Sequence, residues 1–522
     1  MVVLLILSAC QRPAPPPPLA VDEVVFVRDG LVVDGSASLG GLSGQALPGS
    51  RLLIDQPWTA GQALTLAGQP LTAPLQAECL PVWSIELGDV APLVTAGGVP
   101  DTALAFSPGD GRWLAVGTWR GELLVLDGWT GEVRARRRLS EALIRSLAWA
   151  PDGSTLYAAE QSPDAFVRAL DPATLEDRWT LRLADRVESS TPPPGEDLYG
   201  VYSLPAGFGL APVGQGELIV AATHGWGGFE GERRNLAQLL RIGADGAVRA
   251  SWPEQPAEMT LMHPVLDEAK ELVLVAVGHS SSRPAPAELP VGGVQILDSA
   301  GLSPVLALKP EPLRPWFESA AVWQAMGVSK ALDTVLLGLN DGRVLLHGLD
   351  GTLRASVGAG APVMAGDAPV HVGVGWAALS GSQSFYATSP SRIPWGSSSA
   401  ALRPAAPHPD QNRVASHGLD GTPLWSWQGE HELQGLSLSP DGDELLVGAG
   451  ARSSDHRRDL YGGLVFATQP QAPSRLRAFC PTEGPVFFQH AMSPDGRLAL
   501  AEHPFLDEQG RLLGTWRVTV MR

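Results

Sequence analysis

Four short turns of one kind recur along the sequence, and they constrain the fold more than any other feature. They read SPGDG at Ser107, APDGS at Ala150, SPDGD at Ser439 and SPDGR at Ser493. Alternating apolar residues precede each turn, as in TALAF, and a second apolar run such as RWLAVG follows it. Pro and Asp favour the central positions of a type I turn, and Gly accepts the positive φ that follows. Each copy therefore predicts a strand, a tight turn and a second strand.

A second repeated signal is a hairpin whose turn carries Asp and, in most copies, Gly. Its seven copies begin at Leu123, Val167, Leu239, Val294, Val344, Val414 and Leu464. An eighth set begins at Ser493, but the chain ends one strand short of a four-stranded sheet. The segment PVWSIELGD from Pro81 resembles TPLWSWQGE from Thr422, the last strand of a hairpin, yet it precedes every repeat. We expect it to supply the missing strand, because a closed ring leaves no sheet edge exposed.

These four-stranded repeats resemble the WD40-like, quinoprotein-like and TolB-like group of bacterial β-propellers, over roughly residues 75–522. The resemblance implies an all-β fold, a β-propeller closed by its N-terminal strand. We count eight blades, with seven as the alternative if Pro362 to Glu430 forms an elaborated loop. Residues 21–74 hold short alternating strands with Gly turns, and they predict a small β-module, too short to bury a sizeable core alone, that packs on the propeller.

The composition agrees with an all-β chain and excludes one class of partner. The chain has 522 residues with 59 Gly and 46 Pro, as expected for short strands joined by many turns. Acidic residues outnumber basic ones, 55 to 37, and the longest basic run is Arg136 to Arg138. A nucleic-acid-binding protein needs a concentrated basic face, so nucleic acid is not an expected partner.

The first ten residues, MVVLLILSAC, resemble a bacterial lipoprotein signal with its lipobox at residues 7–10. The resemblance implies that Cys10 is acylated and anchors the chain in the cell envelope, and Gln11 implies the outer membrane, with the propeller facing the periplasm or the cell surface. Residues 11–20, QRPAPPPPLA, predict a semi-rigid tether. The alternative is a buried strand with a chance Cys. No Lys or Arg precedes the apolar run, which leaves the natural start codon open.

Cys79 and Cys480 remain after Cys10 is assigned to the lipid anchor. In an exported protein an even pair favours a disulfide, and two separate buried thiols are the alternative. Cys79 stands just before the predicted closing strand, and Cys480 stands just after the predicted outer strand of the preceding blade. A bond between them would staple the ring closure, provided that a loop bends back, because the two strand ends lie at opposite faces.

The predicted loops between second and third strands lie at one end of the propeller, and some are long. Their candidate ligand-binding residues are His224, Trp226, Phe229, His279, Asp455, His456 and His503. Four imidazoles on one rim could bind a metal or an anion. Solvated or hydrogen-bonded loop histidines are the alternative, since none has a local metal-ligand spacing. Trp226 and Phe229, in THGWGGFEGERRN, could stack on a ligand or anchor a partner, or Trp226 could plug its own loop.

No nucleophile elbow, phosphate-binding loop or other catalytic motif occurs, and no cofactor or metal site is assigned from the sequence. The sequence favours an anchored envelope propeller that acts as a protein-binding or scaffolding module. The alternative is a metal- or cofactor-binding, quinoprotein-like enzyme with its site among the long loops. A glycan-binding surface protein is a third hypothesis, which scattered exposed Trp residues would suit.

Overall fold

The structure is a computed structural model, and it divides the chain into an N-terminal module, Met1–Ala77, and a main domain, Glu78–Arg522. It describes residues 23–28, 30–34, 44–47, 51–54, 56, 58, 62–66, 69–74, 77–88, 103–190, 204–226, 234–279, 281–311, 321–358, 363–365, 368–370, 372–388, 408–450, 458–470, 472, 475–506, 509 and 511–522. The expected signal, the Cys10 anchor and the Pro-rich tether lie outside these residues.

The N-terminal module is built from short strands around a small apolar cluster. Four strands form a sheet in the order β1-β2-β4-β3, namely β1 (Glu23–Val27), β2 (Gly30–Asp34), β3 (Gln45–Leu47) and β4 (Arg51–Ile54). A hairpin of β5 (Ala63–Leu66) and β6 (Gln69–Thr72) follows. Phe26, Leu31 and Leu66 lie in the cluster, and the Trp58 ring packs edge-on against Phe26 with 5.4 Å between centroids.

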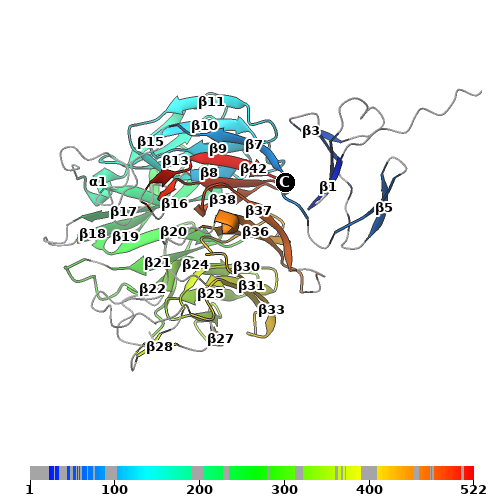
Figure 1. The fold of residues 1–522 in the computed structure, drawn as a ribbon. Helices are drawn as coiled ribbons and strands as arrows, with labels where there is room; N and C mark the ends of the chain where they lie inside the picture. Colours follow the sequence, from blue (N-terminus) through cyan, green and yellow to red (C-terminus); the bar gives the residue numbers. More distant parts are fainter. Residues whose placement is uncertain are drawn as a thin grey trace, which may run out of the picture. The chain divides into compact units, whose positions relative to one another are not determined.

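Most of the described strands of the main domain form eight antiparallel meanders of four strands each, and many of these strands are labelled in Figure 1. The first four are β8 (Ala103–Phe106), β9 (Trp113–Gly117), β10 (Glu122–Asp127) and β11 (Val133–Arg138); β12 (Leu143–Trp149), β13 (Leu156–Gln161), β14 (Phe166–Leu170) and β15 (Asp177–Arg182); β16 (Ala206–Gly214), β17 (Glu217–Trp226), β18 (Arg234–Ile242) and β19 (Val248–Glu258); and β20 (Thr260–Leu266), β21 (Leu272–Gly278), β22 (Gly293–Asp298) and β23 (Pro304–Leu308).

The other four meanders follow the same order, except that the last one takes its outer strand from the N-terminal side. They are β24 (Ala321–Ser329), β25 (Thr334–Leu339), β26 (Arg343–His347) and β27 (Leu353–Gly358); β30 (Val374–Ser380), β31 (Gln383–Thr388), β32 (Arg413–Gly418) and β33 (Pro423–Gln428); β34 (Ser437–Leu438), β35 (Glu444–Ala449), β36 (Gly462–Ala467) and β37 (Leu476–Pro481); and β38 (Val486–Met492), β39 (Leu498–Glu502), β42 (Arg517–Met521) and β7 (Pro81–Glu86). Smaller elements are β28 (Val363–Ala365), β29 (Ala368–Val370), β40 (Phe505–Leu506), β41 (Leu512–Leu513), helix α1 (Ala184–Val187) and the 3-10 turn η3 (Arg458–Leu460).

The first strands of the meanders contact one another in a closed cycle. β8 contacts β12, and the contacts continue through β16, β20, β24, β30, β34 and β38 back to β8. First strands therefore surround the centre, and outer strands such as β11 lie at the periphery. The second strands β13 and β25 are buried along their whole length, because a neighbouring meander covers each face.

Strand β7 closes the ring by pairing antiparallel with β42, and this confirms the closure expected from the sequence. Trp83 lies opposite Val520, and Ile85 lies opposite Val518. The backbone groups of Leu80 and Arg522 exchange two hydrogen bonds, of 2.8 and 2.9 Å, just before the paired segment. The first and the last strand of the main domain therefore belong to one sheet, although more than 400 residues separate them.

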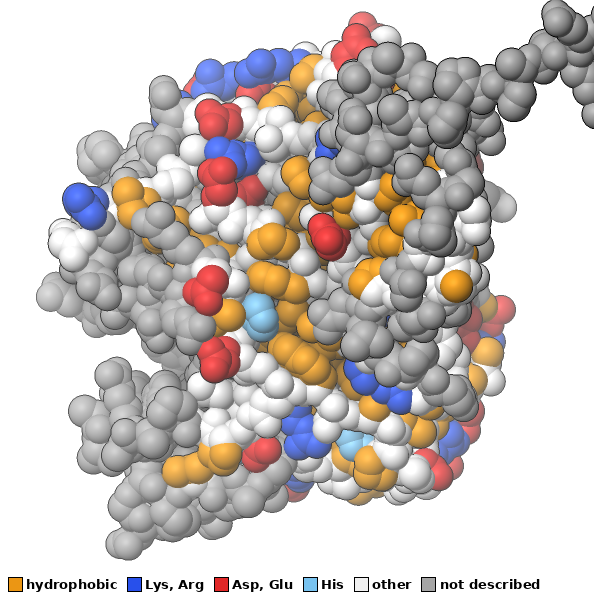
Figure 2. All heavy atoms as spheres, turned by 45° about the vertical axis from the view of Figure 1, so that its right-hand side comes forward, with side chains coloured by type: hydrophobic (Ala, Val, Ile, Leu, Met, Phe, Trp, Pro, Cys, Tyr) orange, Lys and Arg blue, Asp and Glu red, His pale blue; other side chains and the backbone are white. Residues whose placement is uncertain are grey.

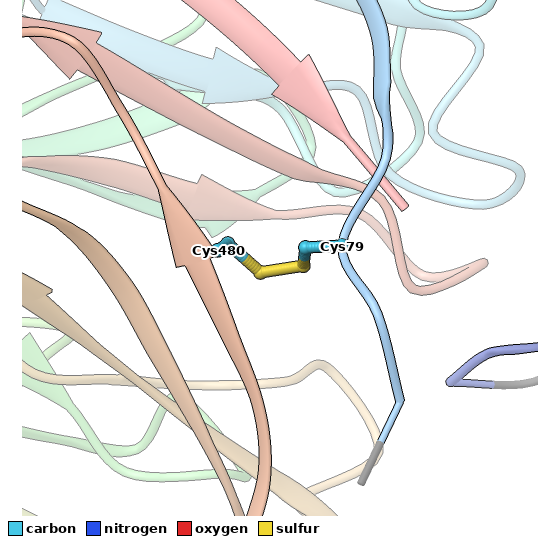
Figure 3. The surroundings of a disulfide bond; sticks show 2 residues. All are labelled: Cys79 and Cys480. Atoms are coloured by element: carbon cyan, nitrogen blue, oxygen red, sulfur yellow. A yellow bond between two sulfur atoms is a disulfide. The ribbon is translucent and has the colours of Figure 1, made fainter. Parts of the chain in front are cut away.

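A disulfide joins Cys79, on the segment that leads into β7, to Cys480 on β37 of the preceding meander (Figure 3). The two Cα atoms are 4.9 Å apart, and 401 residues separate the cysteines along the chain. The bridge therefore fastens the closing strand to the meander beside it. Cys480 lies within β37 rather than just after it.

Tryptophans at the third position of several outer strands dock the meanders onto one another. Trp83, Trp179 and Trp425 occupy this position in β7, β15 and β33, and each is less than 10% exposed. Gly131, in the hairpin of the first meander, has φ +73° and packs so closely on the Trp83 ring that a Cβ atom would lie 2.7 Å from it. The recurring hairpin glycine thus has a second role beside its turn, because it admits the neighbouring indole.

Candidate functional site

The loops between second and third strands all emerge at one end of the propeller, which we call the long-loop end. The sequence placed its candidate residues here. Of these, Phe229, Asp455 and His456 lie outside the described residues, and so does the side chain of Trp226, whose backbone ends β17. His224, His279 and His503 have described positions.

His224 belongs to the interior at the long-loop end. Its side chain is 1% exposed, and Nδ1 lies 2.9 Å from the carbonyl oxygen of Val187, at the end of helix α1. Nε2 lies 3.1 Å from the hydroxyl of Ser190. The imidazole therefore ties the segment that follows α1 to the end of β17, which is a structural role.

An ion-pair network centred on Glu258 lies beside His224. Leu236 of β18 is paired with His224 on one side and with Glu258 on the other. The Glu258 carboxylate accepts hydrogen bonds from Arg234 Nε at 3.1 Å and from the Ser281 hydroxyl at 2.6 Å. Partial burial alone would raise the pKa of Glu258, but these donors outweigh it and lower the pKa. Glu258 is therefore an ionised structural anchor for two neighbouring meanders.

His279 lies close to the same network, immediately after β21. Its Nε2 is 2.8 Å from the carbonyl oxygen of Arg283, and an Arg283 guanidinium nitrogen lies 3.8 Å from a Glu258 oxygen. The structure thus brings the surroundings of His224 and His279 together through Glu258. Each imidazole has its own hydrogen-bond partner.

His503 is far from that network, in the meander that β7 closes. It is fully buried, with its ring centroid 4.5 Å from that of Trp516 and 5.0 Å from that of Phe487. Trp516 in turn packs against Trp119 of the first meander, with 4.5 Å between centroids. Burial lowers the pKa of His503 to about 3, so the ring is neutral at pH 7. This aromatic cluster joins the two meanders at the closure.

Among the described residues, no group of three or more His, Cys, Asp or Glu side chains could hold a metal ion. One carboxylate at the long-loop end, Glu160, is almost fully buried, and burial raises its pKa against the opposing effect of Arg168 at 3.3 Å. The Glu160 carboxylate accepts hydrogen bonds from Arg168 Nε and from the hydroxyl of Ser162, both at 3.3 Å. The described part of the chain contains no helix long and apolar enough to cross a membrane.

The one basic run in the sequence lies on the outer strand β11. Figure 2 shows Lys and Arg side chains gathered along the top edge of the face in view, at the level of β11, with Asp and Glu spread singly elsewhere. Arg136 forms an ion pair with Glu122 at 2.6 Å, and Arg137 forms one with Asp177 at 2.8 Å. Neighbouring carboxylates therefore neutralise these two arginines.

Sequence reasoning missed Glu258 and the pair Trp119 and Trp516. No local pattern marks them, because Arg234, Glu258 and Ser281 come from two meanders, and almost 400 residues separate the two tryptophans. The tryptophans at the third position of outer strands did leave a signal, since PVW, DRW and PLW recur where outer strands begin.

Comparison with known proteins supports the fold and goes no further. No protein-family model matches the chain, and no curated protein matches it. Among solved structures, the C-terminal WD40 domain of Sif2 is 12% identical, with a TM-score of 0.50 over 84% of this chain and 97% of that domain. The computationally designed Ika8 protein (13%, 0.48, 82% and 98%) and BamB from Moraxella catarrhalis (14%, 0.46, 85% and 97%) are also similar. With the sheet order above, the Sif2 likeness shows that the chain is an all-β protein with a WD40-like β-propeller fold.

Proposed function

We propose that this chain is a lipid-anchored protein of the cell envelope whose propeller holds a protein partner at its long-loop end. One observation carries the proposal: the propeller is stapled at its closure by the disulfide between Cys79 and Cys480. Disulfides of this kind persist in oxidising compartments, which an exported chain reaches. The lipobox at Cys10 and the Pro-rich tether of residues 11–20 agree with export followed by anchoring.

We further propose that the propeller has eight blades, one for each four-stranded meander in the cycle of first-strand contacts. The region from Pro362 to Glu430, whose alternative interpretation was a loop, contains the complete meander β30 to β33. Eight blades around a stapled closure make a rigid support. Its long loops can present a binding surface without any rearrangement of the strands.

The long-loop end is the expected partner surface because hydrogen bonds and ion pairs hold the strand ends from which its loops emerge. The Glu258 network joins two meanders at this end, and His224 fixes the segment after α1. Fixed positions at the bases of loops reduce the ordering cost of binding. Arg283 is 46% exposed and Glu188 is 57% exposed, so charged groups of both signs are available to a partner there.

Anchoring is tested by replacing Cys10 with Ser in the natural host and separating membranes from soluble material. The proposal predicts that the wild-type chain remains with the membranes after a high-salt wash and that the C10S chain is released. A C79S variant serves as the control, because it also removes a thiol but leaves the acylation site. Release of both variants, or of neither, would contradict the anchor.

Partner binding is tested by photo-crosslinking in intact cells. A photoreactive residue at Ser282, exposed on the long-loop end, should form one dominant crosslinked protein band. The control places the same residue at Thr130, exposed on a hairpin turn at the opposite end. The same bands from both positions, or none from Ser282, would count against a partner surface at the long-loop end.

A further inference from the structure

A cavity of about 560 Å³ lies at the end of the propeller opposite the long loops. The first strands of four consecutive meanders, β20, β24, β30 and β34, line it together with the turns that follow them. Because first strands surround the centre of the ring, the cavity lies on the inner side of these four meanders. Its volume falls within the range of about 300–1,000 Å³ that is usual for ligand sites.

The wall of the cavity is apolar. Val265, Met326, Leu379 and Leu438 line it, one from each of the four meanders. Met326 is 4% exposed and so is held firmly, whereas the other three are only partly buried and present apolar surface to the cavity. Removal of this surface from water would favour an aliphatic occupant.

Two carboxylates, Glu268 and Asp441, lie at the rim, and none of the described residues that line the cavity is Lys, Arg or His. Both are exposed. Ser329 donates a hydrogen bond of 2.6 Å to Glu268, and Ser439 donates one of 2.5 Å to Asp441. Lys330, which follows Ser329, forms an ion pair with Glu271 outside the cavity. The rim therefore carries negative charge that no lining residue neutralises.

Both rim carboxylates are ionised at neutral pH. The hydrogen bond from Ser439 lowers the pKa of Asp441. Partial burial would raise the pKa of Glu268, but the hydrogen bonds from Ser329 and from the backbone of Ala331 outweigh it and lower that pKa. The serines also hold the two side chains in place at the turns.

We infer that this cavity binds a basic, aliphatic peptide segment of a partner protein, in which Leu or Val side chains fill the apolar wall and Lys or Arg reaches Glu268 and Asp441. The charge complementarity of a negatively charged rim around an apolar wall selects this occupant over an acidic or a wholly polar segment. The site goes beyond the proposed function, since it lies at the end away from the long loops and needs no lipid anchor.

The direct test is calorimetric titration of the full, oxidised chain with a capped hexapeptide of alternating Leu and Lys. Two variants probe the site. E268Q/D441N removes both charges but keeps a side-chain oxygen that accepts the serine hydrogen bond, so the turns should hold. A331W places an indole at the exposed rim position Ala331 and should block the entrance. The control E132Q/D350N removes two charges from hairpin turns outside the cavity.

The inference predicts that the Leu-Lys peptide binds the wild-type chain and the control alike, about tenfold more weakly to E268Q/D441N, and not measurably to A331W. A Leu-Glu peptide should not bind. Equal affinity for the wild-type chain and E268Q/D441N, equal binding of the Leu-Glu peptide, or no binding to the wild-type chain would overturn it. If A331W fails to fold, the affinities of the Leu-Lys and Leu-Glu peptides for the wild-type chain and for E268Q/D441N still test the inference. Loss of membrane anchoring in C10S would leave these results unchanged, so the two proposals fail separately.

Discussion

At the residue scale, the buried ring of His503 makes the stability of the propeller depend on pH. Its folded pKa is about 3, and in an unfolded chain a histidine titrates near 6.5. The unfolded state therefore binds more protons below pH 6.5, and this residue lowers the free energy of unfolding as the pH falls. Neither ring nitrogen has a hydrogen-bond partner, so His503→Phe keeps the packing and removes the titration.

For the H503F variant, we expect the loss of unfolding free energy between pH 7 and pH 5 to be smaller than in the wild-type chain by about 2 kcal/mol. Guanidinium unfolding curves at the two pH values measure this difference. An identical loss in the variant and the wild-type chain would show that His503 is not buried in its neutral form.

The hairpin glycines give a second prediction at this scale. Gly246 has φ +80°, and a Cβ atom added there would lie 2.8 Å from Trp179 of the preceding meander. Gly109 also has φ +80°, but a Cβ atom there would meet nothing within 4 Å. Both Gly→Ala variants should lose about 1 kcal/mol through backbone strain, and G246A should lose about 1–3 kcal/mol more through the clash. Equal losses in thermal unfolding would contradict the docking role of the indole.

At the element scale, β7 is the one outer strand that is far in sequence from the rest of its sheet. Trp83 is 9% exposed, and its indole nitrogen donates a hydrogen bond of 3.0 Å to the carbonyl oxygen of Gly128. Trp425, 8% exposed, holds the same position in β33, whose neighbours are adjacent along the chain. Each Trp→Ala change should cost about 3–5 kcal/mol.

The two variants should differ in where hydrogen exchange increases. W83A should raise exchange in both β7 and β42, because the closing strand detaches and exposes the edge of its partner. W425A should raise exchange only around β33. If the increase in hydrogen exchange in W83A is confined to β7, as the increase in W425A is confined to the surroundings of β33, then β7 contributes no more to closure than an ordinary outer strand.

The sequence predicted individual strands and turns better than it predicted sites. The turns at Ser107 and Ser493 and the hairpin at Val414 predicted strands that the structure contains, because Pro, Asp and Gly fix turn geometry locally. The Glu258 network at the long-loop end and the cavity at the opposite end could not be predicted in this way. Glu268 and Asp441 are 173 positions apart and meet only because the meanders close into a ring.

At the scale of the whole molecule, the disulfide should set the stability of the closed ring. It bridges 401 residues and joins the closing strand to the preceding meander. In the chain-entropy model a bond across so long a loop stabilises the folded state by about 6 kcal/mol. Reduction, or the C79S/C480S variant, should lower the unfolding midpoint to the same value. A midpoint unchanged by reductant would show that the bond does not constrain the unfolded chain.

The central claim is an exported, lipid-anchored propeller stapled at its closure, and one measurement tests it most directly. The chain would be isolated from membranes of its natural host with thiols blocked, digested without reductant, and mapped by mass spectrometry. We predict a crosslinked peptide pair that contains Cys79 and Cys480, together with an N-terminal peptide that begins at an acylated Cys10. Blocked free thiols at both positions and an unmodified Cys10 would contradict the account.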